Sequence, residues 1–175
     1  YKEKLEKYQE KIRALQAEAF YKGVSAVFAF EGWDAAGKGG AIRRLTAAMD
    51  PLSFAVYPYA APNAVERMYH YLWRFWQNVP APGEISIFDR TWYGRVMVER
   101  IEKLTPDVDW RRGYAEINEM EKQWSEANMV LAKFWLQIDQ EEQARRFKDR
   151  EENPEKEWKI TEEDWRNRAK WSDYE

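Results

Sequence analysis

A glycine-rich loop between two patterned segments is the feature that most limits what this chain can fold into. Residues 32–40 read Gly-Trp-Asp-Ala-Ala-Gly-Lys-Gly-Gly, which matches the phosphate-loop pattern G-x-x-x-x-G-K with glycine where serine or threonine is usual. The preceding residues 24–31 are almost continuously apolar, which is typical of a strand buried on both faces of a parallel sheet. Residues 41–49 continue as a helix that ends before Pro51. The order strand, loop, helix therefore predicts an α/β fold.

The rest of the chain continues this alternation of strands and helices. Further strands are expected at residues 54–57, 84–88 and 129–138, and helices at residues 1–22, 64–78, 93–103, 109–127, 140–152 and 161–174. Such alternation implies a parallel sheet covered on both faces. The 175 residues, 45% of them hydrophobic, suit a single domain over 1–175 with one core. Because only four strands are expected and the last residues still follow a helical pattern, we expect a C-terminal strand and helix to be missing.

The loop itself predicts a phosphate site. Glycines allow backbone conformations in which successive N–H groups turn toward phosphate oxygens, and the following helix adds its positive N-terminal end. Lys38 supplies a mobile ammonium for the transferred phosphoryl group. A glycine-rich turn that fits the pattern by chance is the alternative, and the flanking strand and helix count against it. The residues whose backbone is expected to line the phosphate are Gly32, Ala35, Ala36, Gly37, Gly39 and Gly40.

Two aspartates are the candidate metal ligands. Because Gly39 offers no hydroxyl, another oxygen must hold a metal ion, and Asp34 inside the loop is the nearest carboxylate. Mg²⁺ prefers a few carboxylate oxygens together with water and phosphate. Asp89 ends the apolar run 84–88, at the sheet edge where ligands of open α/β folds collect. The alternatives are a turn-capping role for Asp34 and a helix-capping role for Asp89.

Arginines follow Asp89 at the same expected edge. Arg90 and Arg95 carry guanidinium groups that suit phosphate oxygens and the charge that develops during transfer. Arg95 and Glu99 stand four residues apart, so they form either part of a nucleotide site or a simple surface pair on a helix. From Lys38 to Arg100 there are eight Lys and Arg against five Asp and Glu, although the whole chain has a net charge of −3. This local basic surplus is what an anionic substrate requires.

Composition excludes several classes of protein. The chain has no cysteine, which excludes disulfides and thiolate metal sites and fits a reducing, cytoplasmic setting. No stretch approaches the roughly 20 apolar residues that span a bilayer, and residues 1–11 lack the apolar core of a signal peptide. The negative net charge argues against nucleic-acid binding. No membrane or nucleic-acid partner is therefore expected.

Two helices carry residues whose role the pattern alone leaves open. The helix at 140–152 alternates acids with bases, which by itself describes a solvated, salt-bridged face. In the helix at 64–78, an aromatic stripe is either core or a platform for a nucleobase. Arg67 and Arg74 fall near that stripe and are placed to reach an acceptor phosphate, whereas His70, the only histidine, is expected to be structural.

Taken together, these segments resemble the polyphosphate kinase type 2 family from about Tyr21 to Glu175. FEGWDAAGKGGAIRRLT is similar to its Walker A segment and IFDRTWYGRVMVER to its Walker B segment. KFWLQIDQEEQARRFKDRE, followed by WKITEEDWRNRAKW, resembles its strand, lid module and following helix. The resemblance implies a three-layer P-loop kinase fold similar to thymidylate kinase, with a helical lid at about residues 140–160. It also implies magnesium-dependent phosphoryl transfer between inorganic polyphosphate and a nucleoside mono- or diphosphate.

The resemblance also assigns roles to matched positions. Asp34, Lys38, Asp89 and Arg90 become catalytic or metal-linked, and four lid cations are expected to close over the phosphate chain. Trp33 and Gly94, with YLWRFW and ITEEDWRNR, resemble the subgroup that converts AMP to ADP, because many other members carry Arg and Asn there. A homo-oligomer is expected. The lid cations are Arg145, Arg146, Lys148 and Arg150.

Three other functions remain open at this point. The first is phosphorylation of nucleoside diphosphates by the same family. The second is an ATP-dependent nucleotide kinase on the same scaffold. The third, which is not an enzyme, is a silent module that binds nucleotide or polyphosphate.

Overall fold

The chain forms one four-stranded sheet in which every pairing is parallel. A computed structural model describes residues 1–174. The strands are β1 (Ala26–Gly32), β2 (Phe54–Pro58), β3 (Ile85–Asp89) and β4 (Val130–Leu136), in the order β2-β3-β1-β4. The four expected strands and the parallel sheet are therefore confirmed. The carboxyl ends of all four strands meet at one edge, where Phe30 of β1 lies opposite Asp89 of β3 and Phe134 of β4.

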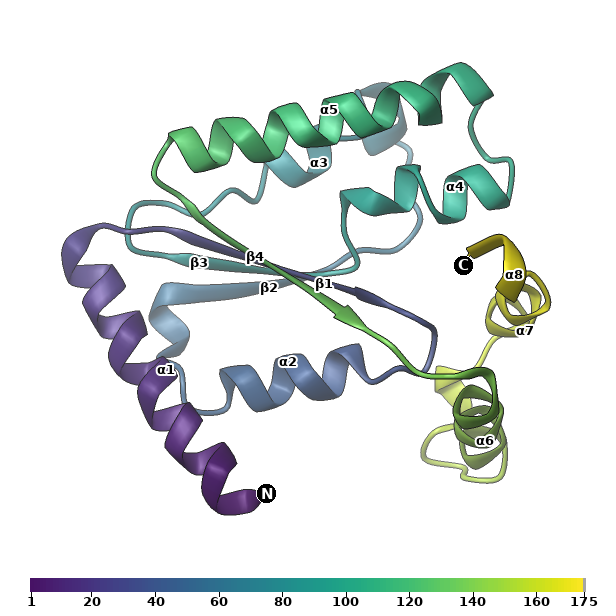
Figure 1. Cartoon of the computed structure of the whole chain (residues 1–175), viewed down its shortest axis with the longest axis horizontal. Helices are drawn as coiled ribbons and strands as arrows, with labels where there is room; N and C mark the ends of the chain where they lie inside the picture. The colour runs from purple at the N-terminus through teal and green to yellow at the C-terminus, as the bar shows by residue number, and fades with distance from the viewer. Residues whose placement is uncertain (175) are drawn as a thin grey trace.

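Helices cover both faces of the sheet and close one of its ends (Figure 1). On one face lie α1 (Lys2–Lys22) and α2 (Lys38–Thr46). The opposite face is covered by α3 (Trp73–Trp76), α4 (Val98–Ile101) and α5 (Asp107–Glu126). Beyond the carboxyl ends of the strands lie α6 (Gln140–Glu151), α7 (Glu162–Ala169) and α8 (Trp171–Tyr174). This is the three-layer arrangement expected from the sequence, with a helical segment beside the phosphate loop.

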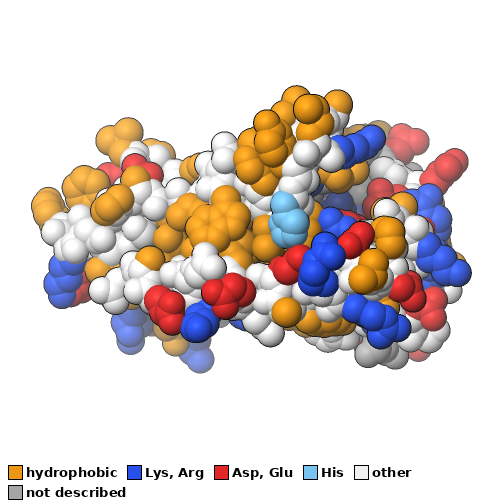
Figure 2. All heavy atoms as spheres, turned by 90° about the horizontal axis from the view of Figure 1, so that it is seen from above, with side chains coloured by type: hydrophobic (Ala, Val, Ile, Leu, Met, Phe, Trp, Pro, Cys, Tyr) orange, Lys and Arg blue, Asp and Glu red, His pale blue; other side chains and the backbone are white. Residues whose placement is uncertain are grey.

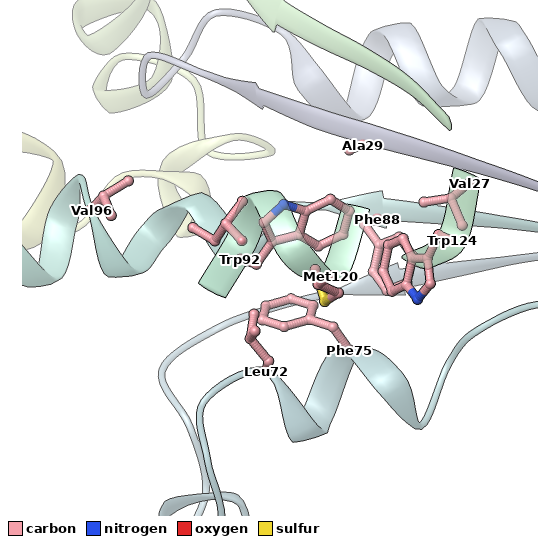
Figure 3. Packing of buried hydrophobic residues seen from close by; sticks show 10 residues of the cluster. Val27, Ala29, Leu72, Phe75, Phe88, Trp92, Val96, Met120 and Trp124 are labelled. Atoms are coloured by element: carbon pink, nitrogen blue, oxygen red, sulfur yellow. The ribbon is translucent and has the colours of Figure 1, made fainter. Parts of the chain in front are cut away.

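The strands bury side chains on both faces because each layer supplies its own apolar cluster. Val27 and Ala29 of β1 pack with residues of α3, η3 (Trp92–Arg95) and α5, whereas Ala26 and Phe30 pack toward α1 and α2. In Figure 3 the first cluster surrounds Trp92, whose side chain is completely buried. Side chains on a strand alternate between faces, so a strand buried on both faces must be apolar throughout. This explains the continuous apolar run before the loop.

The prediction of one continuous helix over residues 64–78 is wrong. The structure has only a 3-10 turn, η2 (Glu66–Met68), and the short α3, with extended backbone at Tyr69. The Asn63 side chain accepts hydrogen bonds from the amides of Val65 and Glu66, and His70 Nδ1 accepts one from Leu72. Asn63 thus supports the start of η2, whereas the His70 acceptor and the extended backbone at Tyr69 separate that turn from α3.

The aromatic stripe of that segment divides in the same way. Leu72 and Phe75 enter the core, as expected of a core stripe, but Met68 is 78% exposed and both Tyr69 and Trp76 are exposed. The core interpretation of the stripe, which comprised Met68, Tyr69, Leu72, Phe75 and Trp76, therefore holds only for Leu72 and Phe75, because the stripe assumed a continuous helix. Figure 2 shows the face covered by α3–α5, where hydrophobic side chains gather in the middle and charged ones crowd the end near the lid.

Two other expected helices are interrupted. Residues 93–103 divide into the 3-10 turn η3 and α4, because Met97 leaves the helical region with φ −108° and ψ −94°. The final helix breaks at Lys170, between α7 and α8. Its expected start is confirmed: the Thr161 amide donates to Asp164 Oδ2 at 2.8 Å. The remaining 3-10 turns are η1 (Pro51–Ser53) and η4 (Glu157–Lys159).

Among residues 1–174, no helix combines the length and the apolar character that a membrane span requires.

Candidate active site

The phosphate loop connects β1 to α2 and is pressed against the end of β4. Gly32 has φ 141°, and a Cβ atom there would lie 2.3 Å from the carbonyl oxygen of Leu136. Ala35 and Gly37 also have positive φ values, 60° and 104°. These turns bring the chain back so that α2 begins at Lys38, with its N-terminal end toward the loop. The glycine at residue 32 is therefore required by backbone packing as well as by loop geometry.

Lys38 lies inside the loop, close to carboxylates. Its Nζ donates to the carbonyl oxygens of Gly32 at 2.7 Å and Trp33 at 3.1 Å. Burial is the largest influence and lowers the pKa of the Lys38 ammonium, while the charges of Asp34, Glu31 and Asp89 act in the opposite direction, in that order. Lys38 thus lies at the sheet edge that also carries both aspartates singled out in the sequence, Asp34 in the loop and Asp89 at the end of β3.

Asp89 and Arg90 form the turn that follows β3. The Asp89 carbonyl accepts a hydrogen bond from the Tyr59 amide at 2.9 Å, and the Arg90 amide donates to the Phe30 carbonyl at 3.1 Å. Arg90 adopts a left-handed conformation, φ 66°, which non-glycine residues adopt rarely and often at functional sites. Its guanidinium lies 3.7 Å from Asp34 Oδ1, across the gap between the two loops.

Asp34 and Asp89 do not have the capping roles that were the alternatives to metal binding. The next turn, η3, is capped by Thr91, whose Oγ1 accepts a hydrogen bond from the Tyr93 amide, so Asp89 is not the cap. The Asp34 carboxylate accepts a hydrogen bond from Asn167 Nδ2 at 2.9 Å. Among the described residues, no backbone N–H of the loop donates to that carboxylate. Neither observation supports a capping role for these two aspartates.

Glu31 supports the turn after β3, although sequence reasoning did not single it out. Its Oε1 accepts hydrogen bonds from the Thr91 amide at 2.6 Å and from Thr91 Oγ1 at 2.9 Å. Burial raises the pKa of the Glu31 carboxyl, while Thr91, Lys38 and Arg90 act to lower it. The sequence feature that could have singled out Glu31 is an acid at the end of an otherwise apolar strand.

The pH dependence of stability should report on Glu31. Because its folded pKa lies above the ordinary value of 4.5, its stabilising contribution is complete below pH 4.5 and is lost as the pH rises through the raised folded pKa. We expect Glu31→Gln, whose amide oxygen still accepts from Thr91, to lack this dependence. Chemical denaturation between about pH 4 and pH 8 measures it. The free energy of unfolding of the wild type minus that of Glu31→Gln should decrease as the pH rises.

A second substitution supplies the control for this pH series. Glu31→Ala leaves the buried Thr91 amide without its acceptor and should cost about 1–3 kcal/mol at every pH. Parallel stability curves for the wild type and Glu31→Gln would contradict the raised pKa.

One of the four predicted lid cations contacts the phosphate loop. Arg146 donates to the Ala35 carbonyl at 2.8 Å and to Glu142 at 2.6 Å. Arg145 is paired with Glu142, Lys148 lies 3.6 Å from Glu152, and Arg150 donates to the Lys159 carbonyl. Among the described residues, Arg146 is therefore the only one of the four predicted lid cations that reaches the loop, while Arg145 and Lys148 form the salt-bridged helix face that was the alternative.

The four predicted nucleotide-binding residues lie on the α3–α5 side of the sheet. Arg95 pairs with Glu99 at 2.9 Å and stacks over Tyr71, and both charged side chains are largely buried. Arg74 lies 3.2 Å from Glu66, and Arg67 donates to the Pro62 carbonyl. None of the four forms a hydrogen bond or an ion pair with the phosphate loop within residues 1–174.

Further contacts with the loop were missed because they come from distant residues. Asn167 of α7 donates to Asp34, and Gln143 of α6 donates to the Asp34 carbonyl at 3.1 Å. The ring of Trp33 stacks on that of Trp171 at 3.6 Å. Asn167 and Asp34 are 133 residues apart in sequence, so no local pattern could have joined them.

The donor set fits a magnesium ion completed by substrate. Asp34 and Asp89 offer hard carboxylate oxygens at the same sheet edge as Lys38. Within residues 1–174, no group of three or more acids and histidines could hold a metal. Mg²⁺ commonly binds through one or two carboxylates, with water and phosphate oxygens supplying the rest. Two aspartates beside a phosphate loop are compatible with that arrangement.

Known proteins are similar to this chain in sequence. A polyphosphate:AMP phosphotransferase of Pseudomonas syringae pv. tomato is 53% identical over 176 residues, covering 97% of this chain and 35% of that protein. One of Acinetobacter johnsonii is 57% identical over 148 residues, covering 85% of this chain and 31% of that protein. The chain thus spans about a third of the length of these relatives.

Solved structures agree with the fold. A crystal structure from Pseudomonas aeruginosa has a TM-score of 0.95 and 53% identity, covering 99% of this chain and 38% of that one. Polyphosphate Kinase 2 from Arthrobacter aurescens has a TM-score of 0.92 and 31% identity, covering 97% of this chain and 62% of that one. The family model described as Polyphosphate kinase 2 (PPK2) matches residues 1–175. With the phosphate loop, the acidic strand end and the parallel sheet all in place, the chain belongs to the polyphosphate kinase 2 family.

Proposed function

We propose that this chain carries the transfer site of a polyphosphate:AMP phosphotransferase. The terminal phosphoryl group of inorganic polyphosphate moves to a phosphate oxygen of AMP, so that ADP forms and polyphosphate shortens by one unit. The observation that carries the proposal is the convergence of Lys38, Asp34, Asp89 and Arg90 at one edge of the sheet. The names of relatives that are 53% identical support AMP as the acceptor.

Lys38 and the loop backbone hold the donor phosphate in this proposal. The Lys38 ammonium exchanges its two carbonyl partners, Gly32 and Trp33, for oxygens of the transferred group. Transfer needs little covalent help from the protein, because positioning and charge stabilisation supply most of the rate. The backbone groups proposed to surround the phosphate belong to Gly32, Ala35, Ala36, Gly37, Gly39 and Gly40.

Asp34, Asp89 and Arg90 act on the negative charge of the phosphate groups beside the loop, Asp34 and Asp89 through a bound metal ion. The two aspartates are the residues that would hold Mg²⁺, which, when bound, neutralises negative charge on phosphate oxygens. Arg90, half-exposed and 3.7 Å from Asp34, is placed to donate to the phosphoryl oxygens as charge develops on them. Glu31 keeps that turn in place through Thr91.

Lid and nucleotide residues complete the proposal. Arg145, Arg146, Lys148 and Arg150 would bind the polyphosphate chain, with Arg146 already at the loop. The side toward the nucleotide is assigned to Arg67, Arg74, Arg95 and Glu99, of which Arg67 is exposed and the other three are held in ion pairs. A homo-oligomer in the cytoplasm belongs to the proposal as well, and light scattering of the purified protein tests the assembly.

The proposal is tested by donor and acceptor choice. The complete protein is assayed with polyphosphate and Mg²⁺, without ATP, and with AMP, ADP, GMP or GDP added separately. ADP formation from AMP is the expected result. Faster turnover of ADP or GDP would favour a diphosphate-phosphorylating enzyme, and a requirement for ATP would favour an ordinary nucleotide kinase. Nucleotide binding without any turnover would favour a silent module.

A further inference from the structure

A tryptophan inside the phosphate loop is buried by residues from the end of the chain. Trp33 is only 8% exposed, although its neighbours in the loop are mostly small. Its ring is parallel to that of Trp171 in α8, with centroids 3.6 Å apart and an angle of 4° between the planes. Trp171 is itself only 6% exposed. The stack therefore joins the loop directly to the segment that follows the lid.

The strand beside the loop supports this stack. Gln137, directly after β4, accepts hydrogen bonds through Oε1 from Trp33 Nε1 at 3.1 Å and from Trp135 Nε1 at 2.6 Å. Trp135 and Tyr174 meet the Trp33 ring edge to face, at 6.4 and 5.8 Å. The indole is thus fixed through its nitrogen, its face and its edges. A buried indole normally finds a partner for its N–H, as this one does.

Polar contacts from the same segment hold the next two residues of the loop. Asn167, one turn before Trp171, donates to the Asp34 carboxylate, and Gln143 and Arg146 donate to the carbonyls of Asp34 and Ala35. Arg168 donates to Gln143 Oε1 at 3.2 Å and so connects α7 to α6. Three successive loop residues are therefore held from outside by the segment 140–174.

We propose that Trp171 is a positioning residue, whose stacking on Trp33 docks α7 and α8 on the phosphate loop and thereby sets Asn167 against Asp34. Hydrogen bonds at the rim can exchange partners with water. The apolar, parallel stack cannot, so it fixes both the distance and the tilt of the docked segment. The effect on catalysis rests on the proposed function, but the docking itself does not.

Hydrogen exchange of the loop amides measures the docking of α7 and α8 without any assay of activity. The amides of Trp33 and Ala36 donate to the carbonyls of Leu136 and Trp33, so a loosened loop should lose protection there. In the complete protein, Trp171→Leu is expected to raise exchange in a peptide spanning residues 33–38 by about tenfold, the change that a 1.4 kcal/mol loss corresponds to. Trp171→Phe, which keeps a ring at that position, should restore most of the protection.

Two further variants separate docking from general destabilisation. Trp158→Leu is the matched control, because Trp158 lies in the same segment but is 74% exposed, and its loop exchange should equal that of the wild type. Trp33→Leu combined with Trp171→Leu should be no worse than either change alone, because residues that act as a pair are non-additive. Unchanged loop exchange in Trp171→Leu, or fully additive effects in the double variant, would overturn the proposal.

Kinetics test the positioning role separately. We expect Trp171→Leu to lower kcat for ADP formation by about tenfold with little change in the KM for AMP, and Trp171→Phe to recover most of it. A loosened loop with an unaltered kcat would overturn the positioning role. Absence of turnover in the wild type would count against the proposed function alone, because exchange still measures the docking.

Discussion

Replacing Lys38 with alanine is expected to lower kcat for phosphoryl transfer by about a thousand-fold or more. The ammonium lies in the loop, half-buried and under the influence of the charges of three carboxylates, and no other cation among the described residues shares its contacts with the carbonyls of Gly32 and Trp33. Removing one preorganised charge from such a site typically costs two to three orders of magnitude, and a positive charge on a transferring phosphoryl group can be worth about 10³–10⁵. Single-turnover assays with polyphosphate and AMP measure the loss.

A matched lysine separates this effect from a general loss of charge. Lys122 on α5 is largely exposed and lies 3.8 Å from Glu126, so Lys122→Ala should retain full activity. Thermal denaturation should show that Lys38→Ala remains folded, because burial already disfavours the Lys38 ammonium in the native state. Normal turnover by a folded Lys38→Ala protein would refute the assignment of the loop.

Gly32→Ala is expected to cause the largest loss of stability. A Cβ at residue 32 would lie 2.3 Å from the carbonyl oxygen and 2.8 Å from the amide nitrogen of Leu136, and φ at this position is 141°. Backbone atoms cannot move aside without separating the loop from β4. We expect the free energy of unfolding to fall by about 3–5 kcal/mol, the range of severe single substitutions. Urea denaturation of the variant and the wild type measures the difference.

Gly39→Ala is the control within the same loop and helix. No atom lies within 4 Å of a Cβ built on Gly39, which sits in the first turn of α2. Alanine there should leave stability unchanged or raise it by about 0.5–1 kcal/mol, because it restricts the unfolded chain without strain. Equal stability of the two alanine variants would mean that β4 does not press on the loop in solution.

The strands and the loop were predictable because their signals are local. Each strand is a short apolar run between glycine, proline or polar residues, and a parallel sheet covered by helices requires such runs. The segment 64–78 failed for the opposite reason. Its aromatic spacing fits a helix, but the backbone is extended at Tyr69, and the Leu72 amide donates to His70 Nδ1 rather than to a helical carbonyl.

The candidate site likewise has residues that local sequence predicts and contacts that it does not predict. Lys38 could be located from its own loop, and Asp89 from the end of its own strand, since both follow from contiguous sequence. The contact of Glu31 with Thr91 spans 60 residues and that of Asn167 with Asp34 spans 133. Such contacts depend on how the sheet and the terminal helices pack, and nothing in the neighbouring sequence encodes them. The contact of Arg146 with the Ala35 carbonyl, across 111 residues, likewise has no local signal.

The sequence by itself determined the positions of the strands, the phosphate loop and the acidic end of β3, because backbone sterics and burial act over a few residues. Only the tertiary structure decided which lid cation reaches the loop, and that Trp33 stacks on Trp171. Those choices come from the packing of α6–α8 against the carboxyl edge of the sheet (Figure 1). Long-range packing selects among many chemically equivalent side chains, and a local pattern cannot distinguish them.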